Sequence, residues 1–251
     1  MKAVPADTQR AMATDEPATG NRLLDALPDD DRKRLVEQGT DISLERGQLL
    51  FERHQRVASV YFPISSVASF LIELRDGASV EMATTGREGM VGISRFLGID
   101  EGLARSICQI PGRALRVDGD AFEIEVERSP TLVRLLQGYL HAFMGLMGQT
   151  VACNRVHTIE QRCARWLLMT RDRIDSSDVP LTQEFLAYML GVRRQSVTEA
   201  AGRLQKSELI SYRRGNITIL DRRGLEEAAC ECYGVIAAGF ERLLPPPGTP
   251  A

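Results

Sequence analysis

The sequence predicts an α+β protein in which an antiparallel β domain is followed by one long helical stretch and a small C-terminal domain. Between Asp41 and Val117, short runs rich in Val, Ile, Phe and Tyr alternate with glycines, as in an antiparallel sandwich or barrel. From Pro130 to Ile174 no further proline interrupts a helical pattern. The segment 181–220 that follows is short, basic and strongly patterned.

The size and composition are those of an ordinary globular protein. The chain has 251 residues, of which 43% are hydrophobic and 26% charged, so one large or two modest domains can each bury a core. We expect five segments: a flexible tail at 1–20, the β domain at 21–128, the central helix at 129–158, the C-terminal domain at 159–240 and a second tail at 241–251.

The β domain opens after a short helical region, Arg22 to Gly39, that is interrupted by Pro28. Asp76-Gly77 stands between two of the β-rich runs, and glycine accepts the positive φ that a tight turn requires. These two residues therefore predict a hairpin.

The central helix carries a row of mostly apolar residues at alternating spacings of four and three. On residues alone this row fits either a helix packed on its own domain or the seam of a parallel dimer. Its members, which we take as the candidate dimer interface, are Leu132, Leu136, Tyr139, Phe143, Leu146, Thr150 and Cys153.

The cysteines show no paired metal-ligand spacing such as C-x-x-C, and their number is odd. We therefore expect reduced thiols, with no disulfide framework, no metal and no cofactor. The N-terminal twenty residues lack the apolar region of a signal peptide, and 132–153 is too polar for a lipid-facing span. A soluble, cytoplasmic protein follows.

Charge is distributed unevenly along the chain. The formal net charge is -3, yet the window from Arg193 to Arg223 holds eight basic and three acidic residues, a local charge of +5. Such a segment on an acidic body is typical of a module that binds a polyanion.

The stretch LTQEFLAYMLGVRRQSVTEAAGRLQ within that region predicts two helices joined by a tight turn. Ala187 is small enough for close helix approach, Gly191 can adopt the left-handed conformation that ends the first helix, and Val197 is the apolar residue that holds the second helix on the first. The spacing Ala-x3-Gly-x5-Val is that of a helix-turn-helix.

The second helix has an apolar side and a polar side. Downstream, ELISYRRGNITILDRRG predicts strand, a Gly215-Asn216 turn and strand, a basic wing that would contact the sugar-phosphate backbone. The candidate DNA-binding residues are Thr182, Arg193, Arg194, Gln195, Ser196, Thr198, Glu199, Arg203, Arg213 and Arg214.

With these motifs in order, the chain from about Leu23 to Leu225 resembles the Crp/Fnr superfamily of bacterial transcription regulators. The resemblance implies a cyclic-nucleotide-binding-like β-roll, a long central dimerisation helix and a C-terminal winged helix-turn-helix. It favours the dimer interpretation of the helical row, and implies a palindromic double-stranded operator and RNA polymerase as partners.

The family's effector cassette is matched imperfectly. Its ribose-binding and phosphate-binding segments would fall on Glu88 with Gly89 and on Arg105 with Ser106, but Arg87 and Ile107 replace a glycine and an alanine. The purine-contacting pair would fall on Met147 and Gly148, which offer no side-chain hydrogen bond. We expect a regulator with a degenerate or unidentified effector pocket; the alternative is a cyclic-nucleotide-responsive regulator with a working pocket at Glu88 and Arg105.

Other sensors and other functions fit less well. An iron-sulfur relative would carry an N-terminal cysteine cluster, yet the first cysteine is Cys108, and His54, His141 and His157 form no haem-ligand pattern. A cupin-like metal enzyme would need clustered histidines, whereas the β segment holds only His54. A protein-contacting helix-turn-helix is disfavoured by the +5 window, so we expect a non-enzymatic regulator.

Overall fold

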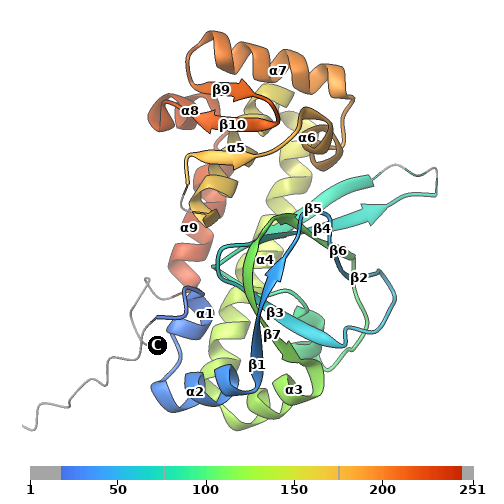
Figure 1. Ribbon diagram of the computed structural model, residues 1–251, viewed down its shortest axis with the longest axis vertical. Helices are drawn as coiled ribbons and strands as arrows, with labels where there is room; N and C mark the ends of the chain where they lie inside the picture. The colour runs from blue at the N-terminus through green and yellow to red at the C-terminus, as the bar shows by residue number, and fades with distance from the viewer. Residues whose placement is uncertain (1–17, 76, 78, 175, 245–251) are drawn as a thin grey trace, which may run out of the picture.

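The computed structural model describes residues 18–75, 77, 79–174 and 176–244, and shows the predicted α+β architecture (Figure 1). Residues 1–17 of the expected N-terminal tail and 245–251 of the expected C-terminal tail lie outside this part of the chain. Two short helices come first, α1 (Arg22–Asp25) and α2 (Asp29–Glu37). Asn21 caps α1, since its side-chain oxygen accepts hydrogen bonds from the amides of Leu23 and Leu24.

The β domain consists of two antiparallel sheets around one core, with strand orders β1-β7-β3 and β2-β6-β4-β5. Strands β4 and β5 pair as the hairpin predicted around Gly77. Residues 76 and 78 of its turn are not among the residues that the structure describes. The elements are β1 (Gly39–Leu44), β2 (Leu49–Phe51), β3 (Ser59–Pro63), β4 (Val67–Glu73), β5 (Ser79–Thr85), the short 3-10 helix η1 (Ile93–Leu97), β6 (Arg105–Ile110) and β7 (Gly112–Asp118).

Three helices follow, and the expected continuous stretch from Pro130 to Ile174 is broken into two of them. They are α3 (Gly119–Arg128), α4 (Pro130–Val156) and α5 (Ile159–Ile174). Ser129 caps α4 by accepting the amide of Leu132 at 3.1 Å, with Pro130 in the first helical position where a missing N–H costs nothing. At the other end His157 adopts an extended conformation, so the chain turns there into α5.

The apolar row of α4 packs inside its own chain. The seven residues from Leu132 to Cys153 that we expected at a dimer interface are at most 8% exposed. Tyr139 illustrates the contact: its hydroxyl donates to the carbonyl of Met90 at 2.8 Å, and its ring lies 5.7 Å from that of Phe143. A partner helix has no access to side chains already covered by the β domain and by the C-terminal helix α9 (Cys232–Leu243), so assigning this row to the dimer contact is a prediction that the structure corrects.

The opposite side of α4 faces solvent. Exposed positions recur there at the same alternating spacing of four and three, and the outer face of α4 consists of Gln137, His141, Met144, Gly148, Val151 and Arg155. Met144 and Val151 are 59% and 71% exposed. The helix thus has a second row that a partner can reach.

The C-terminal domain joins a three-stranded sheet of order β8-β10-β9 to a helical layer. Its elements are β8 (Asp178–Pro180), α6 (Gln183–Leu190), α7 (Arg194–Lys206), β9 (Ile210–Arg213), β10 (Asn216–Ile219), α8 (Arg222–Ala228) and α9 (Cys232–Leu243).

Helix α9 returns from the C-terminal domain to α4, so the helix continues through residues 241–243, which we had placed in a flexible tail (Figure 1). The ring of Phe240 lies 6.3 Å from that of Tyr139, and Ile236 shares the core of the β domain. The winged domain also docks on the β domain directly, because Leu71 and Ile107 belong to the same apolar cluster as Trp166 and Met189. The two halves of the chain are therefore in contact both through α9 and through this apolar cluster.

Among the described helices, none combines the length and the apolar character needed to cross a membrane.

Candidate nucleic-acid interface and effector pocket

The two helices predicted from the Ala187, Gly191 and Val197 spacing are α6 and α7. Thr182 caps α6, its hydroxyl accepting the amide of Phe185 at 3.1 Å. Gly191 ends the helix with φ of 62°, the left-handed conformation for which glycine was expected. Ala187 and Val197 are 5% and 0% exposed, at the contact between the two helices. The helix-turn-helix prediction is confirmed residue by residue.

The polar face of α7 is turned to solvent. Arg193, Arg194, Gln195, Thr198, Glu199 and Arg203 are exposed, and Ser196 is half-buried. No side chain caps the helix at Arg193, so amide groups of its first turn are available to an anion. This face can present both cationic side chains and helix-dipole donors to phosphates and base edges.

Three contacts within the chain modify the predicted roles. The Gln195 side chain donates to the Glu199 carboxylate at 3.2 Å, which holds the two as a pair on one face. The Thr198 hydroxyl donates to the side-chain amide oxygen of Gln183, which belongs to α6, at 2.7 Å. Arg203 forms an ion pair with Glu160 of α5, so part of its charge is already neutralised.

The wing forms one residue earlier than expected. β9 and β10 pair antiparallel with Arg213 opposite Asn216, which makes Arg214 and Gly215 the two turn residues in place of Gly215 and Asn216. Both have positive φ, 49° and 79°, the combination of a type I′ hairpin turn. Arg213 and Arg214 are exposed at the tip, as a phosphate contact requires.

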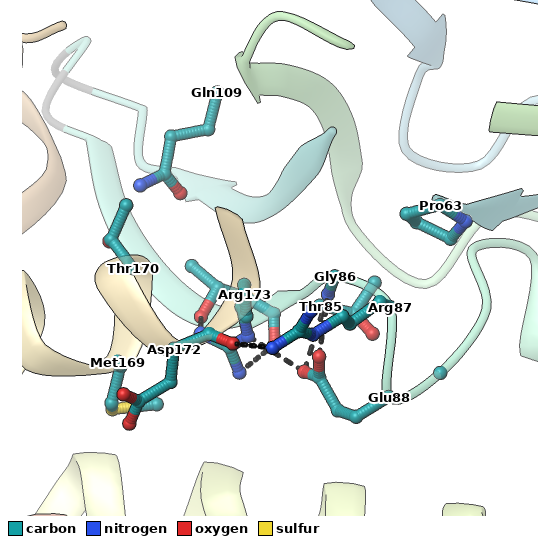
Figure 2. A network of polar contacts seen from close by, with 12 residues as sticks. Pro63, Thr85, Gly86, Arg87, Glu88, Gln109, Met169, Thr170, Asp172 and Arg173 are labelled. Atoms are coloured by element: carbon teal, nitrogen blue, oxygen red, sulfur yellow. Dashed lines mark hydrogen bonds and ion pairs between the residues drawn. The ribbon is translucent and has the colours of Figure 1, made fainter. Parts of the chain in front are cut away.

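The expected nucleotide-binding carboxylate is used for a contact between the two domains. Figure 2 shows Glu88 against Arg173, which comes from α5, and the Arg173 Nε donates to Glu88 Oε1 at 2.7 Å. The same guanidinium donates to the hydroxyl of Thr84 at 2.7 Å, and the Gly86 amide lies 3.2 Å from both oxygens of the Glu88 carboxylate. Side chains of both ion-pair members are at most 10% exposed.

The remaining members of the expected pocket have other neighbours. Arg105 pairs with Glu73 at 2.5 Å and Glu52 at 3.6 Å, and no hydrogen bond or ion pair among the described residues joins it to Glu88. Ser106 is buried, and Gly89 lies so close to Tyr139 that an added Cβ would come within 2.1 Å of the ring. The structure therefore does not assemble Glu88 and Arg105 into one anion site.

The space between the β domain and α4 is apolar. A cavity of about 240 Å³ is lined by side chains that include Phe51, Phe70, Phe143 and Met147. A ligand in this cavity would be held mainly by apolar contacts, with Arg53, His54 and Glu101 also in the lining, whereas a cyclic phosphate needs a full set of charge-assisted hydrogen bonds.

A buried carboxyl group sits at the contact between the two domains. Glu81 of β5 accepts a hydrogen bond from Trp166 Nε1 of α5 at 3.0 Å and lies 2.8 Å from the Ser69 hydroxyl. Burial raises the pKa of Glu81 to about 7, against an ordinary value of 4.5, despite these hydrogen bonds and the charges of Arg165 and Arg173. Near neutral pH this group changes its charge.

We predict that Glu81→Gln stabilises the folded protein at pH 8 and has little effect at pH 4. In unfolded chains Glu81 loses its proton near pH 4.5, whereas in folded chains it holds the proton until about pH 7. Folding therefore binds a proton in this window, and wild-type stability falls as the pH rises through it, by up to about 3 kcal/mol. Urea unfolding of both proteins at pH 4 and pH 8 checks this, and an equal difference at both values would contradict it.

The sequence interpretation missed a cluster of thiols and one imidazole. Cys153, His157, Cys230 and Cys232 come together, with all four potential ligand atoms within 4.8 Å of one another. Cys153 and His157 form a C-x-x-x-H pair, and Cys230 and Cys232 form a C-x-C pair more than seventy residues further along the chain. The absence of a C-x-x-C motif therefore did not indicate whether the chain can bind a metal.

The fold is that of a transcription regulator that binds DNA through a winged helix-turn-helix. Residues 161–228 match the family model of the Crp-like helix-turn-helix domain. This match shows that the chain carries a Crp-like DNA-binding domain and is a DNA-binding transcription regulator, and the chain as a whole shares the fold of solved Crp/Fnr-family regulators. A comparison with curated proteins found no match.

Solved structures of the same fold are similar over most of the chain at low identity. FixK2 from Bradyrhizobium japonicum is 14% identical with a TM-score of 0.64, covering 76% of this chain and 98% of that one. A Crp/Fnr-family regulator from Eubacterium rectale is 15% identical, TM-score 0.62, covering 82% and 96%. CLP from Xanthomonas campestris, described as a c-di-GMP responsive global regulator, is 13% identical, TM-score 0.62, covering 77% and 100%.

Proposed function

We propose that the chain acts as a homodimer that recognises a palindromic DNA site, with α7 in the major groove and the β9–β10 wing on the backbone. The observation that carries this is the exposed polar face of α7, which begins with Arg193 and Arg194 and has no capping side chain. A helix that enters the groove by its N-terminal residues needs this arrangement. Two such helices, related by a two-fold axis, would read half-sites about 34 Å apart.

Within each half-site we assign base reading to Arg194 and the Gln195–Glu199 pair. Arginine suits guanine, glutamine suits adenine, and a carboxylate accepts from the amino group of cytosine. The hydrogen bond from Gln195 to Glu199 holds the two side chains next to each other, so that they would contact neighbouring bases. Arg213 and Arg214 would hold phosphates, and Thr182 lies close to the wing, 3.5 Å from where a Cβ on Gly215 would stand.

The dimer contact that we propose lies on the outer face of α4. Met144 and Val151 are large exposed apolar side chains, and Gly148 between them leaves room for a close helix approach. Leu97, Ile99 and Leu103, each more than half exposed, line the apolar cavity together with Leu140 of α4. A partner helix on this face would cover both groups.

The β-roll effector pocket is, in this proposal, degenerate with respect to cyclic nucleotides, because Glu88 and Arg105 are each engaged elsewhere. We place the regulator in the cytoplasm, in keeping with its five free thiols. Contact with RNA polymerase stays a prediction from the family resemblance.

We predict that Gln195→Ala and Arg214→Ala weaken DNA binding in different ways. Gln195→Ala should cost about 1–3 kcal/mol on the preferred site and little on random DNA. Arg214→Ala should weaken both and make the plot of log affinity against log salt shallower by about one unit. Fluorescence anisotropy over a salt series measures both quantities.

The matched control is Arg223→Ala, which removes an arginine of α8 that is 90% exposed and paired with Glu227. Its affinity and salt slope should stay at wild-type values. Equal losses on preferred and random DNA for Gln195→Ala would show that α7 does not read bases.

A further inference from the structure

Four side chains with metal-binding chemistry meet where the central helix turns into α5. Cys153 and His157 are one helical turn apart at the end of α4, and Cys230 and Cys232 flank Glu231 at the start of α9. The Sγ atoms of Cys153 and Cys230 are 3.5 Å apart, and Cys232 Sγ is 3.5 Å from His157 Nδ1. All three cysteines are nearly or fully buried, and His157 is partly buried.

These spacings fit four ligands around one small cation. Zinc binds thiolate sulfur at about 2.3 Å and imidazole nitrogen at about 2.0–2.1 Å in a tetrahedron, so neighbouring ligand atoms are about 3.5–3.8 Å apart. A disulfide would need sulfurs at about 2.05 Å. An iron-sulfur cluster distributes its ligands over separate iron atoms and needs a wider set. Calcium and magnesium take oxygen ligands, which this set lacks.

Neighbouring groups orient the set in the way that metal sites require. Glu231 Oε2 lies 3.1 Å from His157 Nε2, which leaves Nδ1 directed at the thiols. A carboxylate on the outer nitrogen of a ligating histidine fixes its tautomer and raises its basicity. The Gln149 amide donates to Cys232 Sγ at 3.1 Å, a contact that suits a thiolate.

A buried cation balances the charge that the occupied set would carry. Three thiolates and one zinc ion together have a net charge of -1. Arg162 of α5 is 7% exposed, and within the described chain it makes no ion pair with a carboxylate and leaves Nε without a partner. Its guanidinium donates to the Leu190 carbonyl, and Cys153 and Cys230 are the groups that would favour its charged form, so occupation of the site would give this buried cation a negative partner.

We propose that Cys153, His157, Cys230 and Cys232 bind one zinc ion in a closed tetrahedral site that fastens α9 to the junction of α4 and α5. Four protein ligands leave no coordination position for substrate, which defines a structural site and not a catalytic one. The ion would hold the junction between α4, which belongs to the β-domain half of the chain, and α5, which begins the DNA-binding half.

The test is the metal content of the full chain purified under reducing conditions, and its titration with cobalt(II) after chelation. We expect one zinc per chain, and the visible absorption of tetrahedral cobalt bound to thiolates. Cys232→Ala should lose both, while Cys163→Ala, a control that removes another buried cysteine from α5, should retain both.

A variant outside the ligand set keeps the test independent of folding. Glu231→Gln removes only the carboxylate on His157 and should weaken zinc affinity about 10–100-fold in competition with a chromogenic chelator. Wild-type protein that holds no zinc and gives no cobalt spectrum, or that forms a Cys153–Cys230 disulfide in place of the metal site, would overturn the proposal. So would unchanged metal affinity in both Cys232→Ala and Glu231→Gln.

Discussion

Replacing Arg173 with Met is expected to destabilise the folded chain by about 3–5 kcal/mol, because it leaves the Glu88 carboxylate buried without its cation. The same loss removes the hydrogen bonds from Arg173 to Thr84, which join α5 to the end of β5. Urea unfolding measures the difference. The double variant Glu88→Gln with Arg173→Met should recover part of the loss, since it leaves no buried charge at the site.

An exposed ion pair provides the control for this experiment. Arg113 and Asp41 pair across β1 and β7 with both side chains at least half exposed, so Arg113→Met should cost no more than about 1 kcal/mol.

The Glu88 variants also distinguish a degenerate effector pocket from one that binds cyclic nucleotides. If Glu88→Gln left stability unchanged and abolished measurable cyclic AMP binding in titration calorimetry, the carboxylate would be a nucleotide ligand and the domain-contact role would be wrong.

The second large effect is expected from Met144→Asp combined with Val151→Asp on the outer face of α4. Both residues are exposed in the single chain, so the variant should fold normally but sediment as a monomer, because charges would face each other across the proposed seam. A monomer contacts only one half-site, and its affinity for a palindromic site should fall by several orders of magnitude.

Ile124→Asp on α3, where the side chain is 46% exposed, is the matched control and should remain dimeric. By contrast, Phe143→Asp would place a charge in the core, where the ring contacts Phe70 and Tyr139, and should unfold the chain without informing on the dimer. A folded Met144→Asp/Val151→Asp variant that still sediments as a dimer would exclude the outer face.

The helix-turn-helix could be predicted from sequence because its constraints are local. Gly191 must adopt positive φ, and Ala187 and Val197 must face one another across a turn of fixed length, so three residues within eleven positions define it. The wing was displaced by one residue because Gly215 fits either position of the two-residue turn, and strand pairing with Asn216 decides between them.

Longer-range features could not be read in the same way. The apolar period of α4 defines a buried face but does not say whether the chain's own β domain or a partner covers it. Likewise Glu88 stands in a motif-like position, yet its partner Arg173 lies 85 residues further on. Cys153 and Cys230 meet across 77 residues, so neither half of the thiol cluster indicated the other.

The central claim, that a dimer reads DNA through α7, is tested most directly by selecting binding sites from random double-stranded DNA with the full chain and with Gln195→Ala. We expect the wild type to enrich an inverted repeat with half-site centres about 34 Å apart, and Gln195→Ala to lose the preference at one position of each half-site. Enrichment of no motif, or of an identical motif by both proteins, would contradict the account.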